Sequence, residues 1–263
     1  MRRTFRNTNV RDYWEKRWNN IKSDEEMANE NVYPLKYSQQ IIKDPNAKIL
    51  EAGCGAGRIL RYYHNKGYNI MGIDYIDSAI KKLQATDNTL NVRQEDITNL
   101  SFSDSQFKYV LAFGLYHGID TGLESAIKET FRVMENNGIL CASFRADNIQ
   151  NKINDFLYDY KNKKITSKEN DVLQFHKLNL NKKELSKLFM DAGFDIISIS
   201  PVVNMPILYK FKFFRSKKHK IFNESLGRND GYNLSLIGKI LHSFLFFFFP
   251  NQFCNLYLIN LKK

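Results

Sequence analysis

The stretch that decides the fold is Lys48-Ile49-Leu50-Glu51-Ala52-Gly53-Cys54-Gly55-Ala56-Gly57-Arg58. A short apolar run with the character of a β-strand ends at the carboxylate of Glu51, and glycine then occupies every second position up to Gly57. Such a loop lets the backbone turn sharply and lets a ligand lie against it without an intervening Cβ. A strand, a glycine loop and a helix N-terminus direct backbone N–H groups at one spot, which favours a polar, nucleotide-like ligand.

Strands and helices alternate from this stretch onward, and this alternation predicts a parallel, doubly wound α/β sheet. The expected strands cover residues 48–52, 69–74, 91–94, 109–113, 139–144, 194–200 and 255–261. The expected helices between them cover residues 57–66, 77–86, 123–135 and 181–192. Two further helices are expected before the sheet begins, at 10–18 and 33–43.

Two segments interrupt the alternation and are interpreted as insertions. Residues 145–180 are charged and aromatic, and we expect them to form a lid. Residues 201–252 contain a basic and aromatic run at 210–220 and an apolar run at 234–249 that Pro250 ends. The apolar run is shorter than the ~20 residues needed to span a bilayer, so we expect a buried or interfacial helix.

The composition limits the possible classes of protein. A chain of 263 residues with 43% hydrophobic residues can bury one substantial core. Its net charge of +11 is compatible with nucleic acid, a membrane surface or anionic substrates as partners, and equally with a general compositional bias. The three cysteines lie far apart and predict neither a disulfide framework nor a zinc site. Because the N-terminus lacks the apolar run of a signal peptide, the expected location is the cytoplasm.

The position of the glycines distinguishes between two classes of cofactor. A dinucleotide fingerprint, G-x-G-x-x-G, requires a third glycine where this chain has Arg58. Glycines at 53, 55 and 57, with Glu51 ahead of them, instead resemble motif I of the class I S-adenosylmethionine-dependent methyltransferases. Asp74 ends the second strand, where both families bind ribose hydroxyls, and Asp96 ends the third strand, where the methyltransferases bind adenine.

Three later segments extend this resemblance in the expected order. Residues 112–119 are similar to the motif IV region of the branch that acts on small molecules and glycans. Residues 129–140 resemble the family's "RVL-x-x-GG-x-L" signature, with Asn137 in place of a glycine, and residues 191–194 contain its "AGF". The resemblance implies a Rossmann-like sheet of seven strands, mostly parallel with the last strand antiparallel.

The resemblance also divides the chain, as a single methyltransferase domain, into functional parts. These parts are an N-terminal helical cap (1–47), a cofactor-binding core (48–144), a lid insertion (145–180), the remainder of the sheet (181–200 and 253–263) and a basic and apolar insertion (201–252).

The resemblance assigns S-adenosyl-L-methionine as cofactor, with S-adenosyl-L-homocysteine as product, and no metal. The implied cofactor-binding residues are Tyr13, Trp14, Arg17, Glu51, Gly53, Gly55, Gly57, Arg58, Asp74, Tyr75, Asp96, Ile97 and Phe113. Alternatives remain for several of them: Tyr75 packs in the core, Asp96 serves only a turn, Arg58 only caps the loop, or Tyr13 and Trp14 only anchor a helix.

Methyl transfer from a sulfonium mainly requires alignment of the acceptor and exclusion of water. A hydroxyl acceptor also benefits from a base, and His117 lies just past the fourth strand, where a histidine could accept that proton. Its alternative role is to orient the substrate. Tyr116 is the neighbouring candidate, and His176 in the lid is a third.

The expected acceptor is a small molecule or glycan, because both insertions overhang the carboxyl edge of the sheet. By resemblance, O-methylation of a sugar or phosphate-type group in bacterial surface-polysaccharide synthesis is favoured, and a quinone-like or lipid acceptor comes second. Nucleic acid is disfavoured because the chain lacks the motifs of base methyltransferases. A non-catalytic cofactor-binding protein is the remaining alternative. Residues 210–249 indicate either peripheral contact with the inner membrane face or packing in a homodimer.

Overall fold

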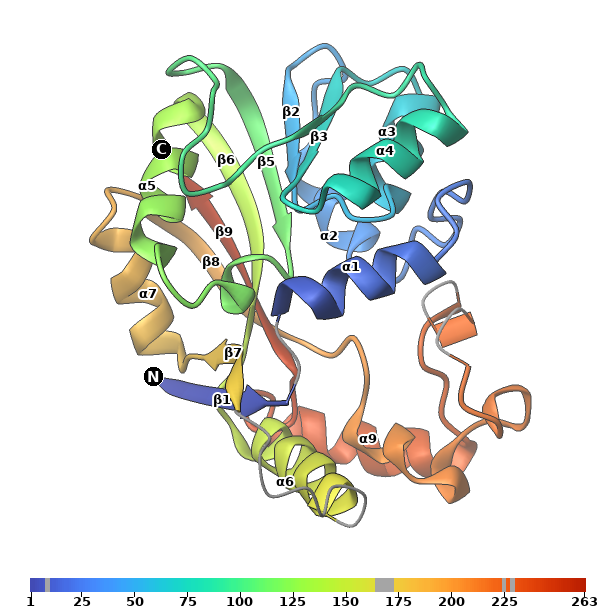
Figure 1. Ribbon diagram of the computed structural model, residues 1–263. Coiled ribbons are helices and arrows are strands. Elements are labelled where there is room, and N and C mark those ends of the chain that lie inside the picture. The colour runs from blue at the N-terminus through green and yellow to red at the C-terminus, as the bar shows by residue number, and fades with distance from the viewer. Residues whose placement is uncertain (8–9, 164–172, 224–225, 228–229) are drawn as a thin grey trace.

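The computed structural model describes all residues except 8–9, 164–172, 224–225 and 228–229 (Figure 1). Its central sheet has seven strands in the order β4-β3-β2-β5-β6-β9-β8. The strands are β2 (Ile49–Ala52), β3 (Ile70–Asp74), β4 (Val92–Gln94), β5 (Phe107–Phe113), β6 (Met134–Arg145), β8 (Asp195–Val202) and β9 (Leu256–Lys262). Neighbouring strands are parallel except that β9 is antiparallel to both β6 and β8. The predicted fold class is therefore confirmed.

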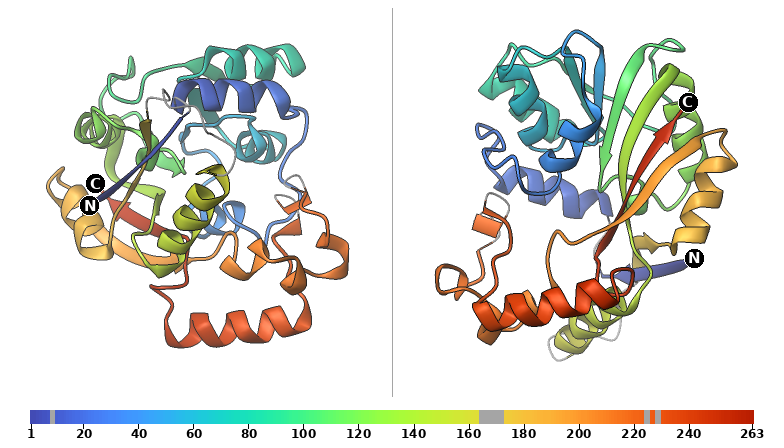
Figure 2. Two further views of the ribbon diagram at one scale, coloured as in Figure 1. Left: turned by 60° about the horizontal axis from the view of Figure 1, so that its bottom comes forward. Right: turned by 180° about the vertical axis from the view of Figure 1, so that it is seen from behind.

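Helices cover both faces of the sheet and bury separate parts of the core (Figures 1 and 2). These helices are α2 (Leu35–Ile41), α3 (Arg58–Asn65), α4 (Asp77–Thr86), α5 (Leu123–Val133) and α7 (Lys182–Met190). The first three pack with Ile49 and Tyr109 on one face, whereas α5 and α7 pack with Leu50 and Val110 on the other. Successive strand residues thus point to opposite faces, as the period of a strand requires.

The order of the strands reverses at β2, which pairs with β3 on one side and with β5 on the other. In open parallel sheets such a reversal leaves a crevice at the carboxyl ends of the strands. The glycine loop follows β2 and leads into α3, so it borders this crevice directly. The predicted site and the topological switch point therefore coincide.

The N-terminal segment is not purely helical, which corrects the expectation for residues 1–47. It begins with strand β1 (Arg2–Arg6), which pairs antiparallel with β7 (Gln174–Asn179) from the lid insertion. Arg2 secures this pairing by donating hydrogen bonds to Asp147 at 2.7 Å and to Asp155 at 2.9 Å. The strand partner is distant in sequence, so local patterning gave no signal for β1.

Two helices flank this two-stranded sheet. Helix α1 (Val10–Asn20) follows β1, and α6 (Ile149–Lys163) precedes β7 and begins the lid. The start of α6 is fixed by Asn148, whose side chain donates to the backbone oxygens of Asn251 and Cys254. In its described residues this insertion is therefore a helix and a strand, and Lys177 of the strand lines the larger cavity.

Two strand boundaries differ from the prediction. β5 begins at Phe107 and β6 at Met134, earlier than expected, because these two residues pair before an irregularity in register. The left-handed residue Asn137, with a φ of 60°, lies within β6 rather than in a separate turn. Asparagine tolerates that conformation better than most side chains do.

The second insertion forms a compact unit of its own. It contains three short 3₁₀ segments, η2 (Ile207–Lys210), η3 (Lys212–Phe214) and η4 (Lys217–His219), followed by helix α9 (Leu236–Phe248). Residues Ile207, Leu208, Tyr209 and Leu234 make up its small hydrophobic core. Within the described residues, no helix is both long and apolar enough to cross a membrane.

Arg132 connects α5 to the loop that follows β4. Its guanidinium donates to the backbone oxygens of Leu100 and Phe102 and to the carboxylates of Glu129 and Asp104. Glu129 in turn accepts from the backbone N–H of Leu100 at 2.8 Å. This arginine of the expected family signature therefore holds the loop that borders the site described next.

Candidate cofactor and acceptor site

Two adjacent cavities lie at the carboxyl ends of the parallel strands. The larger, about 680 Å³, is lined by α1, the ends of β3, β4 and β5, the 3₁₀ segment η1 (Tyr116–Gly118) and β7. The smaller, about 230 Å³, is lined by α1, the glycine loop, Tyr33 and the second insertion. Residues Trp18, Gly53 and Phe113 border both cavities, so together the two form one elongated site.

Asp74 fixes the glycine loop to the end of β3. Its Oδ2 accepts the N–H of Gly55 at 2.9 Å, and its Oδ1 accepts the N–H of Ile76 at 2.9 Å. Burial raises the pKa of the Asp74 carboxyl, while these N–H groups act in the opposite direction. The carboxylate also lines the larger cavity, where its remaining lone pairs can accept two hydroxyl donors.

Two of the loop glycines have distinct steric roles. Gly55, with a φ of 53°, lies against the indole of Trp18, and a Cβ there would approach that ring to 2.5 Å. Gly57, with a φ of 72°, precedes α3, and a Cβ there would come within 2.5 Å of Leu83 on α4. Gly55 therefore opens space on the site side of the loop, whereas Gly57 allows close helix packing.

Glu51 provides a buried carboxylate at the edge of the smaller cavity. Its Oε2 has no hydrogen-bond partner, and burial raises the pKa of the carboxyl to about 8. Arg58 lines the same cavity and acts to lower that pKa. A carboxyl group with one unpartnered oxygen, beside a guanidinium, fits a ligand that carries both an ammonium and a carboxylate group, such as the methionine end of S-adenosylmethionine.

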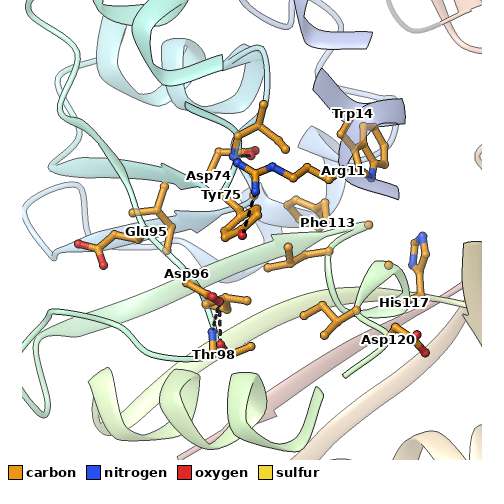
Figure 3. Close-up of a pocket in the computed structure, with 18 of the residues that line it drawn as sticks. Arg11, Trp14, Asp74, Tyr75, Glu95, Asp96, Thr98, Phe113, His117 and Asp120 are labelled. Atoms are coloured by element: carbon orange, nitrogen blue, oxygen red, sulfur yellow. Dashed lines mark hydrogen bonds between the residues drawn. The ribbon is translucent and has the colours of Figure 1, made fainter. Parts of the chain in front are cut away.

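The larger cavity has the features of an adenosine site (Figure 3). Tyr75, Asp96 and Ile97, which the resemblance assigns to the adenosine, all line it. The ring of Tyr75 is half exposed and faces Arg11, whose guanidinium lies 5.0 Å from the ring centroid. Asp96 Oδ1 accepts hydrogen bonds from the backbone N–H and the hydroxyl of Thr98, at 2.9 and 2.8 Å. Part of the hydrogen-bonding capacity of this carboxylate is therefore used within the turn.

The three residues of α1 that were predicted to bind the cofactor, Tyr13, Trp14 and Arg17, lie in different surroundings. Trp14 lines the larger cavity, and Arg17 lines the smaller one. Tyr13 lines neither; its ring packs against Trp14 and against His176 on β7, with centroids 5.1 and 6.4 Å apart. Tyr13 therefore braces α1 against the lid strand, and its role toward the cofactor stays a prediction.

Tyr116 and His117 are the neighbouring candidates for the catalytic base, and their side chains point in different directions. Tyr116 is fully buried, and its hydroxyl shares a 2.7 Å hydrogen bond with Thr130 on α5. Burial also raises its pKa, so this phenol belongs to the core. His117 lines the larger cavity, and its side chain is only 5% exposed (Figure 3).

The environment of His117 keeps its imidazole neutral. Burial, followed by the charges of Lys177 and Arg145, lowers its pKa well below the ordinary value. Its Nδ1 has no hydrogen-bond partner. A neutral imidazole with an unpartnered nitrogen at a cavity wall can orient an acceptor hydroxyl or accept its proton.

Among the lining residues that the sequence did not single out are Arg11, Trp18 and Lys177. Sequence patterning predicted the helix that contains Arg11 and Trp18. The direction in which their side chains point, however, depends on how α1 packs. Lys177 lies on β7, and burial together with Arg145, Arg6 and Arg17 lowers its pKa to about 7. Among the described residues we find no hydrogen bond or ion pair to its ammonium group. Only the pairing of β7 with β1 brings this lysine to the cavity.

Comparison with known proteins agrees with this geometry. Residues 50–142 match a family described as "Methyltransferase domain". An uncharacterized methyltransferase of Schizosaccharomyces pombe is 33% identical over 75 residues, which are 27% of this chain and 52% of the relative. A malonyl-acyl-carrier-protein O-methyltransferase of Enterobacter lignolyticus is 29% identical over 97 residues, 36% of this chain and 37% of that protein. The chain thus spans about half the length, or less, of these two relatives.

A solved S-adenosylmethionine-dependent methyltransferase from Methanosarcina mazei has a TM-score of 0.57 at 19% identity, covering 88% of this chain and 98% of that one. That likeness establishes the fold, a Rossmann-like methyltransferase sheet. The match to residues 50–142 and the fold together support a class I S-adenosylmethionine-dependent methyltransferase. The cofactor of this class is S-adenosylmethionine.

The first prediction concerns Asp74. Asp74→Ala should weaken binding of S-adenosylmethionine about a hundredfold or more, because it removes the ribose acceptor and releases the glycine loop. Isothermal titration calorimetry measures the affinity, with Asp77→Ala as a control that removes a neighbouring carboxylate paired with Lys81. The affinity of Asp74→Asn for S-adenosylmethionine should lie between the affinities of Asp74→Ala and of the control. Wild-type affinity in a folded Asp74→Ala protein would show that the ribose binds elsewhere.

The second prediction concerns protonation of Glu51. At pH 7 the free protein should hold this carboxyl protonated, because its pKa is raised to about 8. A cofactor ammonium beside Oε2 favours the ionised form, so binding should release a proton. Calorimetry in buffers of different ionisation enthalpy measures that proton, and Glu51→Gln should lack this contribution. Equal proton release by both proteins would contradict the assignment of Glu51.

Proposed function

We propose that the protein transfers the methyl group of S-adenosylmethionine to an oxygen atom of a small, anionic acceptor bound in the larger cavity. The observation that carries this proposal is the pairing of two groups at one cavity wall. His117 offers an unpartnered nitrogen, and Lys177 offers an ammonium group without a partner among the described residues. The nitrogen of His117 can accept a hydrogen bond from a hydroxyl, and the ammonium of Lys177 can bind a negatively charged group.

The bound cofactor would supply a methyl group already activated by a sulfonium. Glu51, Arg58 and Asp74 would hold this cofactor, whose methyl carbon would bond to the acceptor oxygen while the electron pair of the broken carbon–sulfur bond stayed on sulfur. His117 orients the acceptor hydroxyl and accepts its proton, which its lowered pKa permits at neutral pH. Trp14, Trp18 and Phe113 exclude water around the reacting atoms.

Among such acceptors we favour a sugar or phosphate-type group of an intermediate in bacterial surface-polysaccharide synthesis. The size of the cavity, about 680 Å³, lies in the range of small-molecule sites, and Lys177 in its wall supports a charged acceptor. The name of the Enterobacter relative, an O-methyltransferase, supports oxygen as the methylated atom. A quinone-like or lipid acceptor is the second candidate, supported by the exposed apolar helix α9.

A direct test combines cofactor binding with transfer of a labelled methyl group. The protein is incubated with methyl-labelled S-adenosylmethionine and fractionated metabolites from its own host, and labelled products are identified by mass spectrometry. Label in an anionic, oxygen-methylated small molecule is the expected result. Cofactor binding without any labelled product would favour a non-catalytic protein, and label in RNA would overturn the proposed acceptor class.

The third prediction separates the two roles open to His117. If His117 accepts the proton, His117→Asn should lower kcat about a hundredfold or more while leaving KM for S-adenosylmethionine nearly unchanged. Release of S-adenosylhomocysteine measures the rate. His176→Asn is the matched control, because it alters the neighbouring buried histidine on β7. Retention of most of the turnover by His117→Asn would reduce its role to orientation.

The fourth prediction is a pH dependence set by Lys177. Burial, together with Arg145, Arg6 and Arg17, lowers the pKa of its ammonium to about 7, against the opposing effect of Asp155. The positive charge is present below pH 7 and is lost as the pH rises, so KM for an anionic acceptor should rise above pH 7. Lys177→Met should raise KM about tenfold and remove this dependence. A pH-independent KM in the wild type would exclude this lysine as the anion-binding group.

A further inference from the structure

Helix α9 exposes a continuous apolar face. Its exposed apolar side chains are Leu236, Ile237, Ile240, Leu241, Phe244, Phe247 and Phe248. At 100° per residue these positions fall within one sector of about 140°. On the opposite side Gly238 is buried against Phe214, where a Cβ would approach the backbone oxygen to 2.7 Å. The helix is therefore anchored by one side and presents its aromatic side outward.

A group of lysines lies on the segments that join the start of α9 and on the helix itself. Lys210, Lys212 and Lys217 are exposed on the 3₁₀ segments, and Lys239 is exposed on α9 itself. Hydrogen bonds from Ser235 to the backbone oxygen of Phe214, and from Ser216 to that of Asn233, join the segments to the start of α9. In the described part of residues 201–252 the one acidic side chain is Asp230, which pairs with Lys218. Exposed phenylalanines at 211 and 213 interleave with the lysines.

We propose that α9 and residues 210–220 form a docking surface for an anionic membrane. The phenylalanines of α9 enter the boundary between headgroups and acyl chains, and the neighbouring lysines contact lipid phosphates. Charge decides between a membrane and a second copy of this chain. A twofold contact through α9 would bring lysines against lysines without carboxylates to pair them, which disfavours self-association.

The docking surface adjoins the site. Asn204 and Tyr232, from the same insertion, line the smaller cavity. Figures 1 and 2 show α9 on the side of the molecule toward which the carboxyl ends of the parallel strands point. A docked protein would therefore hold its site close to the lipid surface. The docking itself does not depend on methyl transfer, so it can be tested independently of the proposed reaction.

Vesicle flotation of the intact protein tests the proposal. The protein is mixed either with vesicles of phosphatidylcholine alone or with vesicles that also contain phosphatidylglycerol, at low and high salt. We expect flotation with the anionic vesicles and a clear loss at high salt. Equal flotation with both compositions, or no flotation with either, would overturn the proposal. So would a lipid-free dimer, seen by light scattering, that Phe247→Ser dissociates.

Two sets of variants assign the binding to this surface. Phe244→Ser with Phe247→Ser and Phe248→Ser should abolish flotation without unfolding the protein, because all three side chains are exposed. Lys210→Glu with Lys212→Glu and Lys217→Glu should weaken it about tenfold or more. The matched control reverses the same number of charges at exposed lysines elsewhere, Lys43, Lys128 and Lys183. Equal loss with the control would overturn the assignment to this surface, and thermal unfolding confirms that each variant is folded.

Discussion

Two backbone N–H groups, those of Gly55 and Ile76, converge on the carboxylate of Asp74 and tie the glycine loop after β2 to the end of β3. Because β2 and β3 are parallel neighbours, this contact joins the two strand ends at the point where the strand order reverses. The curvature of the loop and the access of a ligand to its backbone both follow from it. The same carboxylate must then serve two purposes, as a structural acceptor and as part of the cavity wall. Few other side chains in the molecule combine these roles.

Unsatisfied polar atoms mark the two ends of the elongated site. Oε2 of Glu51 lacks a partner at the smaller cavity, and Nδ1 of His117 lacks one at the larger cavity. Leaving such an atom buried costs about 1–3 kcal/mol each, a cost that a bound ligand can offset. Burial raises the pKa of the Glu51 carboxyl and lowers the pKa of the His117 imidazole. Both side chains are therefore neutral in the free protein at pH 7. Perturbed groups of this kind gather at functional sites more often than elsewhere.

The sequence predicted β2, β3 and β5 well because each is a short apolar run that ends at or beside a glycine or an acidic residue. The sequence did not predict β1. This strand pairs with β7, which is distant in the sequence, and such a pairing leaves no local pattern. Lys177 was missed for the same reason, since nothing in its neighbours marks it as part of a cavity wall. Tyr116 and His117 could not be told apart because they are adjacent in one 3₁₀ turn. Only packing sends the phenol toward Thr130 and the imidazole toward the cavity.

The pairing of β1 with β7 also has a consequence for how the two ends of the site are connected. Tyr13 on α1 packs against His176 on β7, and Arg3 on β1 pairs with Asp120 beyond η1 at 3.1 Å. Helix α1, which covers the glycine loop through Trp18, is thus braced to the strand that carries Lys177. Any change in the position of α1 would therefore also alter the wall that carries Lys177, so both ends of the elongated site depend on the same contacts.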